Sequence, residues 1–196
     1  MEKIFLINSS KNVEGIIMGK ATQDLRKEHD IILHVLYITD EIISTVTEDV
    51  KIMHFGKELV YFLQIFGDKC HHGKEENYLF KELENQGVPN EGGPIGVMLK
   101  EHQEGRIYID LMNKAVEAED SANFKINAGN YSNLLHNHIE KENNILFVMA
   151  DEILDDRKQD ELFEAFELHE ENVIGHGIHE KLHSMIHKWT EEFDVH

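Results

Sequence analysis

The sequence predicts an all-α protein, an up-down antiparallel four-helix bundle with one or two extra helices at its C-terminus. Apolar residues recur at helical spacing in four long stretches, all within the first 155 residues, and fairly short connections join these stretches. The 196 residues include only two prolines, and both lie in a single connection. The stretches themselves therefore lack the residue that most strongly breaks helices.

The first two helices are expected over residues 21–46 and 50–84. At 100° per residue, each gathers apolar side chains on one face: Leu25, Ile32 and Leu36 in the first, and Phe62, Ile65, Leu79 and Leu83 in the second. Residues 86–94 follow with both prolines and three glycines, a composition typical of a loop.

The third and fourth helices are expected over residues 95–118 and 129–154. Their apolar faces are marked by Met98, Ile109 and Val116, and by Leu134, Ile145 and Met149. Helical spacing continues beyond residue 155 and ends in a segment near 178–193, which is too short for a core of its own. We therefore expect an N-terminal arm (1–20), the bundle (21–155) and a C-terminal helical extension packed on it (156–196).

Composition narrows the classes of function. The chain carries 38 acidic and 19 basic residues, a formal net charge of −19, whereas proteins that grip nucleic acid or anionic membranes need a basic face. No uncharged apolar run approaches the ~20 residues of a membrane span, and the run at residues 4–7 is too short for a signal peptide. Cys70 is the only cysteine, so no intramolecular disulfide can form. We expect a cytoplasmic protein without nucleic-acid or membrane partners.

Histidine is abundant, with 14 residues, and several histidines interrupt the apolar faces. His29, His102 and His138 lie on the inward faces of the first, third and fourth helices. Glu142 follows His138 at i+4, a spacing that puts two ligands on one face of a helix. The second helix offers two overlapping pairs with the same spacing: His71–Glu75 and His72–Glu76.

An internal repeat favours the first of these pairs. Residues 71–80 match residues 138–147 at six of ten positions, which pairs His71 with His138 and Glu75 with Glu142. Helix phase alone favours His72, but the repeat places His72 and Glu76 one residue out of phase with the ligands. Residues 27–29 also resemble residues 100–102, so each pair of helices brings the same set of side chains.

The chemistry follows from the cost of burial. Two buried carboxylates repel one another and are tolerable mainly where cations neutralise them. Imidazole with carboxylate suits iron, zinc or manganese, and four imidazoles with two carboxylates divide naturally between two metals. The predicted ligands are His29 and His71 on one metal, His102 and His138 on the other, with Glu75 and Glu142 bridging both.

Other polar residues allow further interpretations. Arg106 lies one turn from His102 and could pair with a bridging glutamate or steer an anion. Tyr131 is expected to pack in the core, and its alternative role is that of a ligand or electron donor. Histidines line one face of the last helix, where a metal could bind through an i, i+4 pair, although a half-exposed flank is the favoured interpretation. These histidines are His176, His179, His183 and His187.

These motifs resemble the hemerythrin-like, or HHE cation-binding, family over about residues 25–147. The resemblance implies a four-helix bundle with two non-haem iron ions, bridged by an oxo or hydroxo group, at the six ligands named above. Oxygen-carrying hemerythrins use a fifth histidine on the third helix and an aspartate on the fourth, whereas this chain has Met98 and Arg106 around His102, and Glu142. The pattern is more similar to the four-His, two-Glu branch, which is linked to iron–sulfur repair under nitrosative stress, iron sensing and peroxide handling.

Three functions are compatible with this reading. The first is a redox di-iron protein that acts on peroxide, nitric oxide or oxygen with a redox partner protein. The second is a non-catalytic module that binds or senses oxygen or iron, and the third is a structural bundle with an incidental metal. The first predicts turnover of one of the three ligands, the second predicts reversible binding without turnover, and the third predicts a spectrum indifferent to all three ligands. The redox protein is the leading hypothesis.

Overall fold

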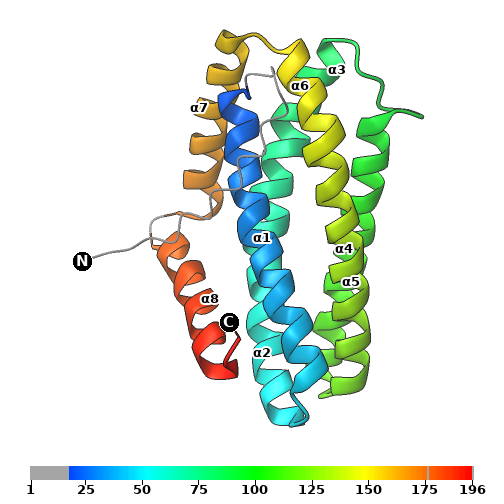
Figure 1. The fold of residues 1–196 in the computed structure, drawn as a ribbon, viewed down its shortest axis with the longest axis vertical. Helices are drawn as coiled ribbons and strands as arrows, with labels where there is room; N and C mark the ends of the chain where they lie inside the picture. The colour runs from blue at the N-terminus through cyan, green and yellow to red at the C-terminus, as the bar shows by residue number, and fades with distance from the viewer. Residues whose placement is uncertain (1–17, 176, 196) are drawn as a thin grey trace.

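The computed structural model describes residues 18–175 and 177–195, with only the backbone of residue 179. Over this part of the chain, four long helical segments run antiparallel as a bundle and two further helices lie against one side (Figure 1). The described residues form no strand, so the predicted all-α bundle with extra C-terminal helices is confirmed. None of the described helices is long and apolar enough to cross a membrane.

The described helical segments follow the order of the prediction. In the bundle, the first long segment is α1 (Lys20–Thr45) and the third is α4 (Pro94–Glu117). The second consists of α2 (Asp49–Phe62), η1 (Leu63–His72), η2 (Glu75–Leu79) and α3 (Phe80–Asn85). The fourth consists of α5 (Ser121–Lys141), η3 (Glu142–Leu146) and α6 (Phe147–Ile153). The two added helices are α7 (Asp156–Val173) and α8 (Ile178–Phe193). The predicted arm ends inside α1, and its residues 1–17 lie outside the described part of the chain.

The fourth segment begins earlier than predicted. It starts at Ser121 rather than at residue 129, because the Asp120 side chain accepts a hydrogen bond from the backbone N–H of Asn123 and caps the helix at 3.0 Å. Phe124 and Ala128 then extend the buried face by two turns. The prediction missed this start because polar residues surround the two buried positions.

The segments η1, η2 and η3 are π-helical. Hydrogen bonds from residue i to i+5 put more residues into each turn, so neighbouring side chains are separated by less than the 100° of an α-helix. The register of the buried face shifts accordingly. Ile145, predicted to face inward, is 55% exposed, and the next residue, Leu146, is buried instead.

Two hydrophobic clusters fill the bundle, one towards each end. The first includes Phe55, Phe62 and Phe124 and is covered by α8 through Trp189, which is fully buried. The second, at the opposite end, is covered by α7 and consists of Ala21, Leu25, Leu79, Phe80, Leu83, Val88, Ile95, Met98, Leu146, Phe147, Ala150, Leu154, Leu162 and Phe166. Figure 1 shows the corresponding positions of α7 and α8 along α1. A layer of polar side chains separates the two clusters.

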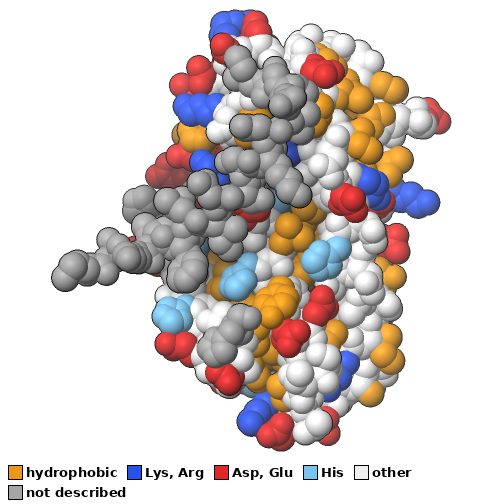
Figure 2. Space-filling view, in the orientation of Figure 1, with side chains coloured by type: hydrophobic (Ala, Val, Ile, Leu, Met, Phe, Trp, Pro, Cys, Tyr) orange, Lys and Arg blue, Asp and Glu red, His pale blue; other side chains and the backbone are white. Residues whose placement is uncertain are grey.

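The outer surface reflects the acidic composition. Acidic side chains are spread along the whole length of the face shown in Figure 2, among fewer basic ones. The carboxylates of Glu75 and Glu142 differ from these surface groups because they are buried inside the bundle.

Candidate metal centre

The polar layer brings together side chains from every long segment of the bundle. Each is at most 2% exposed: His29 from α1, His71 and His72 from η1, Glu75 from η2, His102 from α4, His138 from α5 and Glu142 from η3. All six residues predicted as ligands are in this layer, which we call the centre.

The centre divides into two groups whose ligand atoms lie within 4.8 Å of one another. One group consists of His29, His71, Glu75 and Glu142, and the other of His72, Glu75, His102 and His138. The predicted assignment made the same division of the four expected histidines. That these residues bind metal stays a prediction.

The two glutamates face both groups. Glu75 places Oε1 at 3.6 Å from Nε2 of His71 and Oε2 at 3.4 Å from Nε2 of His102. Glu142 places Oε2 at 3.2 Å from Nε2 of His29 and at 3.2 Å from Nε2 of His138. Both carboxylates therefore lie between the two groups of imidazoles, where bridging ligands would lie.

The expectation that His72 lies away from the centre is wrong. The repeat placed His72 out of phase with the ligands, but His71 and His72 both turn inward, because η1 is π-helical and its adjacent residues are separated by a smaller angle than in an α-helix. Glu76, the other member of the rival pair, stays outside both groups. It accepts hydrogen bonds from Nδ1 of His102 at 2.7 Å and from Arg106 at 2.8 Å.

The four predicted histidines share one orientation. In each ring Nε2 is turned inward and Nδ1 contacts an oxygen outside the centre. The partners of Nδ1 are Asn143 at 2.9 Å for His29, Glu28 at 2.8 Å for His71, Glu76 at 2.7 Å for His102 and Glu101 at 3.0 Å for His138. Such partners fix the ring and its tautomer in metal sites.

The sequence reasoning did not identify these supporting residues, although a signal for them exists. Glu28 directly precedes His29, and Glu101 directly precedes His102, in the repeated Lys-Glu-His triplets. Each glutamate supports the histidine of the following segment rather than its neighbour in sequence. Lys74 and Lys141, three residues after the supported histidines, contact Glu28 and Glu101 in turn.

The donor set fits metal ions. Several deeply buried atoms in the centre make no hydrogen bond: Nε2 of His29, Nε2 of His71, both ring nitrogens of His72, and all four carboxylate oxygens of Glu75 and Glu142. Leaving one such group unsatisfied costs about 1–3 kcal/mol, and more when it is charged. Imidazole nitrogens and carboxylate oxygens are ligands for iron, zinc and manganese, so two cations would satisfy these atoms together.

The charges of the centre are unequal without metal. Burial and then the charge of Glu142 raise the pKa of Glu75 well above its usual value. Burial alone would raise the pKa of Glu142, but the attraction of His138 outweighs it and holds that pKa low. Burial opposes the charge of His138, yet Glu142 and Glu101 raise its pKa to about 9. His138 thus holds a proton at neutral pH that a metal must displace, and the raised pKa of Glu75 favours its protonated form.

Metal binding at pH 7 is therefore expected to release protons, because a metal must displace the proton of His138 and any proton held by Glu75. The release is measured with a pH indicator when Zn²⁺ or Fe²⁺ is added to weakly buffered, metal-free protein. Because protons compete with the metal, affinity should rise with pH, by about tenfold per unit for each proton displaced. Metal uptake without proton release would contradict this charge distribution.

Lys74 is a buried cation beside the centre. Its ammonium donates to Glu28 at 2.7 Å, to Glu170 of α7 at 2.9 Å and to Asp24 at 3.2 Å, and the side chain is 1% exposed. Burial lowers the pKa of Lys74, but Glu28 and then Asp24 raise it above its usual value. Cys70, Glu28 and Glu170 also approach one another, and Lys74 already supplies the positive charge at that position.

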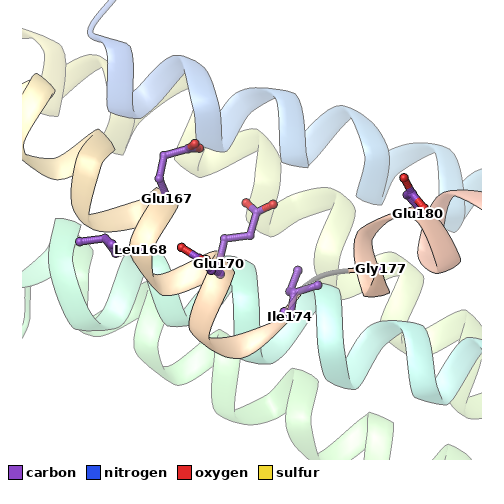
Figure 3. A pocket seen from close by; sticks show the side chains of 8 residues that line it. Glu167, Leu168, Glu170, Ile174, Gly177 and Glu180 are labelled. Carbon is purple, nitrogen blue, oxygen red and sulfur yellow. The ribbon is translucent and has the colours of Figure 1, made fainter.

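A pocket opens where α7 ends and α8 begins, and Glu170 lies in its wall (Figure 3). Glu167 and Glu171 from α7 and Glu180 from α8 also line it, so the pocket is acidic. The contacts from Glu170 through Lys74 and Glu28 to His71 connect this wall to the centre.

The Lys74→Met variant is expected to lose about 3–5 kcal/mol of unfolding free energy, because three carboxylates would remain around an apolar side chain. Urea unfolding measures the change. Lys20→Met is the matched control: its partner Asp160 lies at 3.6 Å and both side chains are exposed, so a change within about 0.5 kcal/mol is expected. Equal effects of the two substitutions would show that the Lys74 cluster does not stabilise the fold.

The remaining candidates have other environments. Arg106 pairs with Asp68 and Glu76, not with a bridging glutamate. Tyr131 packs in the first hydrophobic cluster, and Cys70 is buried in the same cluster. In the last helix His183 and His187 are exposed, whereas residue 176 and the side chain of residue 179 lie outside the described part of the chain.

Comparison with known proteins identifies the domain. The model of the hemerythrin HHE cation-binding domain family matches residues 20–150, which cover every residue of the centre and the bundle up to the middle of α6. Comparisons with curated proteins and with solved structures gave no match. The matched range is well over half of the chain, and it contains the buried His/Glu layer that a cation-binding domain needs. The chain belongs to the hemerythrin HHE cation-binding domain family.

Proposed function

We propose that the chain is a non-haem di-iron protein that handles peroxide, nitric oxide or oxygen in oxidative or nitrosative stress or in iron homeostasis. The observation that carries the proposal is the position of Glu75 and Glu142 between two groups of imidazoles. Bound iron would supply redox chemistry and an open coordination position for the small ligand.

Burial limits the size of that ligand. Every side chain of the centre is at most 2% exposed, and aromatic rings pack against its imidazoles, with Phe147 stacked on His29 at 5.2 Å and Phe80 stacked on His102 at 5.8 Å between ring centroids. The chain thus excludes bulk water and large substrates. An apolar pocket of about 180 Å³ includes Met98, one turn before His102, and Leu146, one turn after Glu142, and suits a small uncharged molecule.

A second candidate is a non-catalytic module that binds or senses oxygen or iron. The contacts from His71 through Glu28 and Lys74 to Glu170 favour it, because they link the centre to α7, outside the bundle. A change at His71 could reach α7 along these contacts without any turnover.

The test is metal analysis of the purified protein combined with its optical spectrum under oxygen, peroxide and nitric oxide. The proposal expects two irons per chain, a spectrum that changes with one of the three ligands, and consumption of that ligand. A reversible change without consumption would favour the binding module. A spectrum indifferent to all three ligands would overturn the first candidate and the binding or sensing of oxygen in the second. The Glu75→Ala variant is the metal-poor control.

A further inference from the structure

The centre has one histidine that the predicted ligand set does not use. His72 is 2% exposed, and neither of its ring nitrogens makes a hydrogen bond. Its ring stacks on that of His102 with the centroids 3.8 Å apart and the planes 16° from parallel. One of its nitrogens lies within 4.8 Å of the ligand atoms of Glu75, His102 and His138.

We propose that His72 is a third imidazole ligand of the metal held by His102 and His138. This inference rests on the proposed function, because it requires a dinuclear centre. Glu75 and Glu142 face both groups and would be shared by the two metals. One metal would then have three imidazole ligands, His72, His102 and His138, and the other would have two, His29 and His71.

The surroundings of His72 follow the pattern of the other imidazoles. Its Nδ1 lies 3.6 Å from Oδ1 of Asp68, and Asp68 is held by the guanidinium of Arg106 at 2.7 Å. Each of the four other rings also has Nδ1 beside an oxygen outside the centre and Nε2 turned inward. Because Nδ1 of His72 likewise faces an oxygen outside the centre, its Nε2 is the nitrogen available to bind a metal.

The internal repeat shows that His72 breaks the symmetry of the centre. Alignment of residues 71–80 with 138–147 places Ile139 opposite His72, whereas His71 and Glu75 have identical counterparts. Ile139 is buried and belongs to the first hydrophobic cluster. Two metals held in this way would therefore be inequivalent in their protein ligands.

The decisive variant is His72→Ile, which gives position 72 the residue that the chain already carries at the equivalent position. Metal-free protein is loaded anaerobically with Fe²⁺ enriched in the Mössbauer isotope. We expect two iron environments of equal area in the unsubstituted protein. In His72→Ile we expect the environments to become alike and one of the two irons to bind about tenfold or more weakly.

Matched controls separate the role of His72 from packing. Ile139→Val changes the equivalent buried position and should leave both iron sites unchanged. If His72→Ile does not fold when metal-free, as judged by circular dichroism, His72→Ala is loaded with and without imidazole, which should restore the second environment. Failure of imidazole to restore it would overturn the proposal.

The two proposals fail in different ways. Two irons bound with unchanged affinity and spectrum in His72→Ile would overturn the role of His72 and leave the di-iron function standing. Unsubstituted protein that binds fewer than two irons would overturn both proposals. Two irons in identical environments would overturn the role of His72 and leave the di-iron function standing.

Discussion

Removal of the metals is expected to lower the midpoint of thermal unfolding by about 15–30 °C. A ligand present at about a thousand times its dissociation constant stabilises the folded state by about 4 kcal/mol, so two such sites contribute about 8 kcal/mol. For a chain of this length each kcal/mol shifts the midpoint by about 2–4 °C. Metal loss also leaves the buried oxygens and nitrogens of the centre without partners.

Scanning calorimetry of metal-loaded and chelator-treated protein measures this difference. The Glu75→Ala variant, which should hold no metal, controls for the chelator itself and should melt at the same temperature before and after treatment. Equal midpoints for the loaded and stripped forms of the unsubstituted protein would contradict a metal that is part of the folded core.

The bundle could be predicted because its helices obey α-helical periodicity over most of their length. Residues such as Leu25, Ile32 and Leu36 recur at that spacing and are all buried. Four of the six expected ligands followed from the repeat between residues 71–80 and 138–147, which does not depend on a precise helical angle, and His29 and His102 followed from the apolar faces of their helices. The structure places all six in one buried layer.

Two of the errors fall where the helix is not an α-helix. Ile145 was expected inside the bundle from 100° per residue, whereas His72 was expected outside the centre because the repeat outweighed helix phase, which alone favoured His72. Both residues lie in π-helical segments, η1 and η3, where that angle does not hold. Nothing in the local sequence marks these segments, and π-helical turns are known to concentrate at functional sites.

The supporting residues were missed for another reason. Glu28 and Glu101 lie next to ligands in sequence but serve histidines of the following segments, His71 and His138. A helical pattern gives the direction of a side chain, whereas such a contact depends on how two helices are docked. The repeated Lys-Glu-His triplets indicate that these glutamates are equivalent without showing what they contact.

The bridging glutamates lead to the sharpest test of the ligand assignment. Glu75→Ala and Glu142→Ala are each expected to abolish or strongly weaken binding of both metals, because each carboxylate faces both groups and offsets the charge of both cations. His29→Ala should instead weaken one metal first and leave a partly loaded, magnetically uncoupled centre. Metal content by mass spectrometry and the magnetic spectrum distinguish these results.

Two neighbouring glutamates provide matched controls for that test. Glu140 is exposed, two residues before Glu142, and Glu140→Ala should keep two metals with unchanged affinity. Glu76 supports His102 through Nδ1 from outside the centre, so Glu76→Ala should keep two metals and weaken one of them by about 10–100-fold. Two metals retained in Glu75→Ala together with loss of both in Glu76→Ala would mean that the ligand register is wrong by one residue. Retention of two metals in all of these variants would place the metal site elsewhere in the chain.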